Sequence, residues 1–160
     1  METNYNKLLN LVENHNVSML TTKQNDGLLK SRPMGISEIN KDGSIWFFSN
    51  ENSCKANEIE AHPQVNINIS DTKNQVYVSI SGEASVHKDE QKMKELMNPM
   101  VKAWFPDGID DPTISLIKVQ MEKAAYWTNE NNKLTQLFEF GKAWATGKQA
   151  DIGEHESIEV

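Results

Sequence analysis

Hydrophobic and polar residues alternate with period two along several stretches of the chain, which is the pattern of strands with one buried face. Val65, Ile67 and Ile69 alternate with polar neighbours, and the same alternation runs through residues 76–86. The apolar run at residues 45–48 is continuous and is typical of a buried strand. Further strands are expected at residues 17–23, 28–39 and 114–128, which makes about six in total.

Short turn sequences join these expected strands. Asn-Asp-Gly at residues 25–27 and Lys-Asp-Gly at residues 41–43 predict tight hairpins, because glycine accepts the positive φ of such turns. Pro33 predicts an edge position or a bulge, since proline cannot donate to a strand ladder. Gly82 inside a long strand indicates a bulge or a close backbone approach. Sequential strands with short turns favour a mainly β (α+β) fold, an antiparallel barrel, over a doubly wound parallel sheet.

Helical spacing is confined to a few segments that flank the strands. Asp89 can cap one of these helices, and the Pro63 that follows His62 can end another. A loop carrying Trp104 and Phe105 is expected at residues 101–112. The expected helices cover residues 4–14, 53–61, 89–97 and 134–144. Residues 1–147 are therefore predicted to form a single domain, followed by a polar, acidic and disordered tail at residues 148–160.

Composition narrows the class of protein. The 160 residues are 38% hydrophobic and 24% charged, which fits one globular domain with its own core. The net charge of −7 argues against nucleic-acid binding, since phosphate neutralisation needs an excess of lysine and arginine. No apolar run is long enough to span a membrane, and no secretion signal is visible, so a cytoplasmic location is expected. Cys54 is the single cysteine, and the 4 scattered histidines predict no metal site.

The expected junction between the strand at residues 45–48 and the following helix carries candidate chemistry. Ser49, Ser53 and Lys55 gather where first-turn N–H groups lack partners and the helix dipole is positive, which suits a phosphate. An ordinary helix cap beside a surface lysine explains the same residues. Cys54 is either a reactive thiol at a helix N-terminus or a small filler.

Arg32 lies one hairpin upstream, and adjacent strands can bring its guanidinium to the same anion as Lys55. Aromatic side chains could then supply a flat apolar slot. A ligand with a phosphate and an aromatic ring would be a nucleotide or a flavin. The alternative is that Arg32 and Lys55 are ordinary solvated surface residues and form no site. The aromatic candidates are Trp46, Phe47, Phe48, Trp104, Phe105 and Trp127.

The run from Phe47 to Val65 resembles the signature of the pyridoxamine 5′-phosphate oxidase-like FMN-binding split barrels. That signature reads aromatic–Phe–[Thr/Ser]–Asn–x–x–Ser–x–Lys–x–x–Glu–[Ile/Leu]–x–x–x–Pro, and Ser-Arg-Pro-Met-Gly-Ile lies upstream of it here. The runs at residues 76–86, 104–112 and 124–128 resemble the general stress protein 26 branch. The resemblance covers about residues 5–130.

This resemblance implies a six-stranded antiparallel split β-barrel with flanking helices. It also implies a homodimer with FMN, or alternatively FAD, bound at the subunit interface. Arg32 and Lys55 would hold the phosphate with Ser49 and Ser53. Residues implied to line the flavin ring and ribityl chain are Pro33, Met34 and Phe48, and those implied to come from the partner subunit are Tyr77, Ser79, Trp104 and Phe105.

Two departures from the oxidase itself limit the implied activity. Cys54 stands where the oxidase has a basic residue before the lysine, and the C-terminal W…R-x-R segment is absent. Oxidation of pyridoxamine phosphate is therefore not expected, and no catalytic residue is assigned. A flavin-dependent oxidoreductase of unknown substrate and a non-catalytic, redox-buffering flavin protein both stay open. A haem- or deazaflavin-binding relative is a remoter reading, because no histidine suits an axial ligand.

Overall fold

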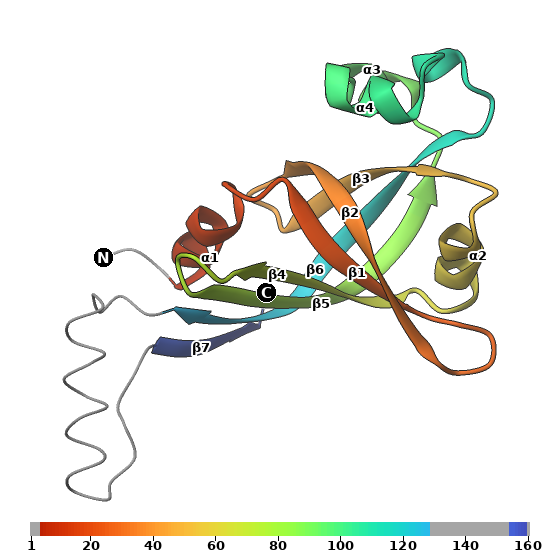
Figure 1. Cartoon of the computed structure of the whole chain (residues 1–160). Helices are drawn as coiled ribbons and strands as arrows, with labels where there is room; N and C mark the ends of the chain where they lie inside the picture. The colour runs from red at the N-terminus through yellow and green to blue at the C-terminus, as the bar shows by residue number, and fades with distance from the viewer. Residues whose placement is uncertain (1–3, 129–153, 160) are drawn as a thin grey trace, which may run out of the picture.

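The computed structural model describes residues 4–128 and 154–159, and its centre is a closed antiparallel barrel (Figure 1). The strands follow the order β3-β2-β1-β4-β5-β6, and pairing of β3 with β6 closes the barrel. This confirms the six-stranded antiparallel barrel that the sequence predicts. The strands are β1 (Val17–Lys23), β2 (Leu29–Ile39), β3 (Ser44–Asn50), β4 (Gln64–Asp71), β5 (Val76–His87) and β6 (Ile114–Thr128).

Two tight turns fold the first three strands into a meander, as their sequences predict. Gly27 has φ of 88° and Gly43 has φ of 80°, a region that glycine enters without steric penalty. Asp26 accepts a hydrogen bond from the Leu28 N–H, and Asp42 accepts one from the Ser44 N–H. These aspartates satisfy the backbone of each turn locally, which fixes the strand register.

The alternating residues of the strands fill the barrel with one apolar core. Two helices cover its openings: α1 (Asn4–Val12) contributes Leu8 and Val12, and α2 (Cys54–Ala61) contributes Ile59 (Figure 1). The Ser53 side chain caps α2 by accepting from the Ala56 N–H, as expected for this junction. The strand residues of this core include Leu20, Ile45, Phe47, Ile67, Ile80, Ile117, Val119 and Tyr126.

Gly82 confirms the prediction of a bulge and a close backbone approach. The register between β5 and β6 shifts between Ser81 and Gly82. A Cβ built on Gly82 would lie 2.2 Å from the carbonyl oxygen of Gln120. Any side chain at this position would therefore push the two strands apart.

The segment of the chain that connects β5 to β6 forms a lobe outside the barrel (Figure 1). It contains α3 (Glu90–Leu96), α4 (Pro99–Trp104) and the short helix η1 (Gly108–Asp110). Asp89 caps α3, as expected. The expected loop at residues 101–112 is wrong for residues 101–104, because Pro99 begins a helix that ends at Trp104. Asn98 accepts from the N–H groups of Met100 and Val101, and proline suits the first helical position.

The tail also differs from its prediction. Residues Glu154–Glu159 form β7, which pairs with the C-terminal half of β6 from Lys123 to Thr128. The predicted disorder of residues 148–160 is therefore wrong for this segment, because an edge of β6 offers a backbone ladder to pair with. The helix expected at residues 134–144 lies outside the described residues. Within the described part of the chain, no helix has the length and hydropathy needed to cross a membrane.

Candidate functional site

A pocket of about 570 Å³ opens where β2 and β3 separate. The two strands pair only from Ile36 onwards on β2, so Pro33 has β1 as its neighbour on one side and, among residues 4–128 and 154–159, no strand on the other. This edge position confirms the prediction for Pro33 and explains how proline is tolerated here. Besides β2 residues 33–37, the pocket is lined by residues at the start of β1, the end of β3, the first turn of α2, and α4.

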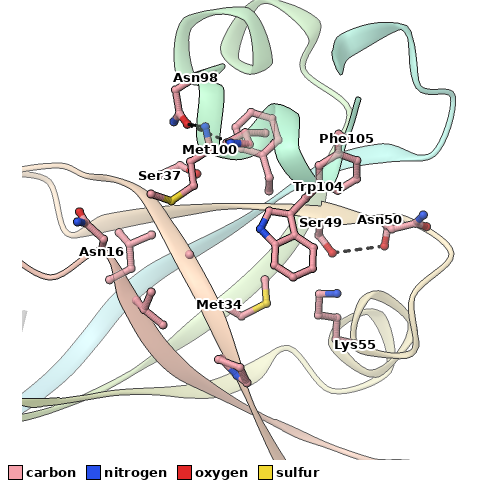
Figure 2. A pocket seen from close by; sticks show the side chains of 16 residues that line it. Asn16, Met34, Ser37, Ser49, Asn50, Lys55, Asn98, Met100, Trp104 and Phe105 are labelled. Carbon is pink, nitrogen blue, oxygen red and sulfur yellow. Dashed lines mark hydrogen bonds between the residues drawn. The ribbon is translucent and has the colours of Figure 1, made fainter. Parts of the chain in front are cut away.

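Apolar side chains form the wall of the pocket that faces the lobe. Met34 and Phe48 come from the barrel, whereas Trp104 and Phe105 come from α4 and its C-terminal end (Figure 2). The rings of Phe48 and Phe105 contact each other at 6.4 Å between centroids with a 46° tilt. Trp104 is 81% exposed although it lines the pocket. An exposed indole beside an apolar cavity provides a surface on which a planar ring can stack.

The pocket lining also carries a cation and a hydroxyl. Lys55 points into the pocket beside the buried Ser49 (Figure 2), and Ser49 Oγ lies 3.5 Å from Ser53 Oγ at the α2 N-terminus. Burial lowers the pKa of Lys55 below its usual 10.5, and the nearby positive charge of Arg32 lowers it further. No residue in the described ranges forms an ion pair with Lys55. An anion in this pocket would stabilise the charged form of Lys55 and so offset the lowering of its pKa.

Arg32 lies next to this cluster, but its guanidinium is already engaged inside the protein. Nη2 donates to Glu58 Oε2 at 2.9 Å, Nη1 donates to Thr22 Oγ1, and Nη1 also lies 3.5 Å from the Leu20 carbonyl oxygen. Thr22 in turn donates to Glu58 Oε2. Two of the guanidinium nitrogens, Nη1 and Nη2, thus donate to Thr22 and Glu58, and the predicted bidentate contact of Arg32 with a phosphate stays a prediction.

The four residues assigned by resemblance to a partner subunit fall into two groups. Trp104 and Phe105 line the same pocket as Lys55 within one chain, so this contact needs no second subunit. Tyr77 and Ser79 lie elsewhere, on the outer face of β5. The structure therefore joins nine of the eleven predicted residues in one region, with Arg32 and Ser53 just behind the pocket lining.

The outer position of Ser79 can be followed across the sheet. Met19 on β1 lies opposite Pro33 on one side and opposite Asn68 on the other. Asn68 lies opposite Ser79. Opposed residues share a face, so one row runs over the outer surface from the pocket edge to Ser79.

Sequence reasoning assigned no role to the residues that hold Arg32, although Glu58 is the glutamate of the signature Ser–x–Lys–x–x–Glu. Glu58 is buried between Ala56 and Ile59, two apolar residues of α2 that pack against the barrel. A carboxylate within the buried face of a helix is itself a signal, because buried charges are nearly always paired. Thr22 carried no comparable signal, since a threonine in a strand is ordinary.

The described lining of the pocket has little acid–base chemistry. Lys55 is its one titratable residue, and the described residues contain no cluster of three potential metal ligands. Cys54 is exposed as the first residue of α2 and does not line the pocket. Such a site can hold an anion and stack a planar ring, and any redox reaction would have to come from the bound group.

The barrel, split between β2 and β3 and covered by short helices, is a split-barrel fold. The family model described as "Pyridoxamine 5'-phosphate oxidase like" matches residues 3–151. The chain belongs to this family. A curated relative, Protein bli-3 of Neurospora crassa, is 27% identical over 168 residues that cover 99% of this chain and 80% of the relative.

Solved structures share the fold. The general stress FMN/FAD binding protein of Xanthomonas citri has 26% identity and a TM-score of 0.69, covering 79% of this chain and 89% of that one. A protein from Clostridium acetobutylicum related to general stress protein 26 has a TM-score of 0.74 and covers 98% of this chain and 94% of its own. At 14% identity, this second likeness supports the fold alone.

Proposed function

We propose that the protein binds a flavin in the pocket between β2, β3 and α4. Lys55 carries this proposal: it is a part-buried cation with a lowered pKa and no ionic partner among the described residues, at one end of an aromatic-walled cavity. A phosphate dianion there would gain charge-assisted contacts from Lys55 and Ser49. The X. citri relative, named for FMN/FAD binding, supports the same ligand class.

The residues present fit FMN. The phosphate would lie beside Lys55, with Ser53 at the α2 N-terminus behind it, and the ring would lie against Met34, Phe48 and Trp104. FMN is favoured over FAD because Lys55 is the one cation in the described pocket lining, which matches a single phosphate better than a diphosphate. Bound flavin would supply hydride or electron transfer, and the protein would orient the ring and exclude water.

A homodimer is part of the proposal. The outer face that contains Ser79 carries exposed apolar side chains at its margins, including Val17 at 57% and Met19 at 40%. Val17 and Pro33 belong both to this face and to the pocket lining. A second copy covering the face would bring its Tyr77 and Ser79 toward the pocket mouth and shield the flavin from solvent.

The direct experiment is titration of the purified protein with FMN, followed by absorption and fluorescence. Binding should quench flavin fluorescence and sharpen its visible bands, with riboflavin binding at least tenfold more weakly because it lacks the phosphate. Equal affinity for FMN and riboflavin would contradict the phosphate assignment. Light scattering that reports only monomer at micromolar concentration would contradict the shared site.

The second part of the proposal is that the bound flavin takes part in an oxidation or reduction of a specific substrate. The pocket lining favours a reaction that needs no side-chain acid or base. A flavin oxidoreductase predicts a donor that reduces bound FMN much faster than it reduces free FMN. A redox-buffering protein predicts equal rates. Stopped-flow reduction of free and bound FMN by NADH and NADPH distinguishes the two.

A further inference from the structure

Glu58 is buried, charged and directly bonded to a residue expected at the phosphate site. Its side chain is 8% exposed, and that of Arg32 is 17% exposed. Thr22, fully buried, bridges the two by accepting from Arg32 Nη1 and donating to Glu58 Oε2. We call Thr22 and Glu58 the arginine seat.

The seat uses one side of the guanidinium and leaves the other. A guanidinium has five N–H donors arranged as two forks, one between Nη1 and Nη2 and one between Nε and Nη2. Thr22 accepts from Nη1 and Glu58 accepts from Nη2, and the Leu20 carbonyl oxygen lies 3.5 Å from Nη1. No described residue accepts from Nε. One planar fork, suited to two oxygens of a single phosphate, is thus left.

The arginine seat holds Arg32 near Lys55, so that the remaining fork and the Lys55 ammonium could bind one anion together. Arg32 lies close enough to Lys55 to lower its pKa, and Glu58, on the next turn of α2, partly offsets that effect. Glu58 therefore holds two cations near one another that would otherwise repel. The negative charge of Glu58 by itself would weaken anion binding nearby. Any contribution of Glu58 to anion binding must therefore come from the orientation that it gives to the Arg32 guanidinium.

We propose that Glu58, with Thr22, is the positioning residue of the phosphate end of the pocket: it fixes Arg32 so that the Nε/Nη2 fork meets the same phosphate as Lys55. This inference rests on the proposed flavin function. A simple charge effect predicts that removing the negative charge of Glu58 strengthens phosphate binding, whereas the positioning role predicts that it weakens it. Removing the negative charge of Glu58 should weaken phosphate binding, because a loose Arg32 loses its direction.

The test compares Glu58→Ala with Glu60→Ala, which removes the same charge from an exposed position on the same helix. Glu58→Ala should weaken FMN binding about tenfold, by analogy with metal sites, where removing a hydrogen-bond partner of a ligand costs about 10- to 100-fold. Riboflavin binding should stay within twofold, since it has no phosphate. Glu60→Ala should leave both affinities near wild type, and Glu58→Gln, whose amide oxygen still accepts from Nη2, should recover most of the FMN affinity.

Unchanged or tighter FMN binding by Glu58→Ala would overturn the positioning role while leaving the proposed function intact. Failure of the wild-type chain to bind FMN would instead overturn the proposed function. If Glu58→Ala does not fold, Thr22→Val decides the matter: it keeps the shape of the buried residue and removes the bridging hydroxyl. A loss of FMN affinity without loss of riboflavin affinity in Thr22→Val supports the seat, and wild-type affinity for both refutes it.

Discussion

Replacing Lys55 with methionine should separate ligand binding from stability. The ammonium is partly buried and faces the positive charge of Arg32, and both effects lower its pKa. Methionine keeps the apolar stem and removes the charge. The variant should therefore lose anion binding without losing fold stability.

The expected loss of FMN binding follows from the contact removed. One charge-assisted hydrogen bond contributes about 1.5–3 kcal/mol, which is roughly a 10- to 150-fold rise in Kd. Riboflavin affinity should change little. Lys102→Met is the matched control, since Lys102 is exposed on α4 and does not line the pocket.

Stability should move in the opposite direction. A lysine whose pKa is lowered on folding destabilises the native state at every pH where it is protonated, so Lys55→Met should be more stable than wild type at pH 7, by up to about 0.5 kcal/mol. This advantage should begin to shrink at the lowered pKa of the folded state, be smaller at pH 10.5, and vanish only above 10.5, where the lysine is neutral in both states. Urea unfolding without flavin at pH 7 and at pH 10.5 measures it.

Either of two results would refute this reasoning. FMN affinity within twofold of wild type would mean that Lys55 does not contact the phosphate. A clear loss of stability at pH 7 would mean that the ammonium has a partner that stabilises the fold.

Three other substitutions test different features. Gly82→Ala should destabilise the fold by about 3 kcal/mol or more in urea unfolding, because its Cβ would lie 2.2 Å from Gln120 O; near wild-type stability would show that the bulge can relax. Trp104→Ala should weaken FMN and riboflavin binding alike by about 1 kcal/mol, with unchanged stability because the indole is 81% exposed. Arg32→Ala should lower stability by about 3 kcal/mol by leaving Glu58 buried without its cation, and the loss should shrink in Arg32→Ala/Glu58→Gln.

The strands were predictable because each presents one face to the core, so that burial imposes period two on residues such as Val65, Ile67 and Ile69. Gly27, Gly43 and Gly82 were predictable for a different reason, since each meets a backbone requirement that other residues satisfy poorly. Such constraints are local in sequence and can be read from one chain.

The lobe and the tail were harder to predict. Pro99 ends one helix and also begins the next, and the sequence alone does not say which role dominates. β7 is polar and pairs through its backbone along an edge of β6, so its side chains carry little signal.

The site was predictable where motif residues meet at a strand–helix junction, as Ser49, Ser53 and Lys55 do. The direction of Arg32 was not, because it depends on Thr22 and Glu58, which are 10 and 26 residues away in sequence. Contacts of one side chain with residues far away in the sequence produce no periodic pattern from which they could be predicted.

The lobe between β5 and β6 shares a small apolar core with the barrel, in which Met93 of α3 packs with Ile114 and Leu116 of β6. Both of its ends join neighbouring strands that are paired with each other along their length. Mutations can therefore accumulate at exposed positions of this insertion, such as Met100 and Trp104, without loosening the barrel. Since the insertion supplies the Trp104 indole, relatives can diverge in which planar rings they admit while keeping Lys55 and Ser49, the residues proposed to bind the phosphate.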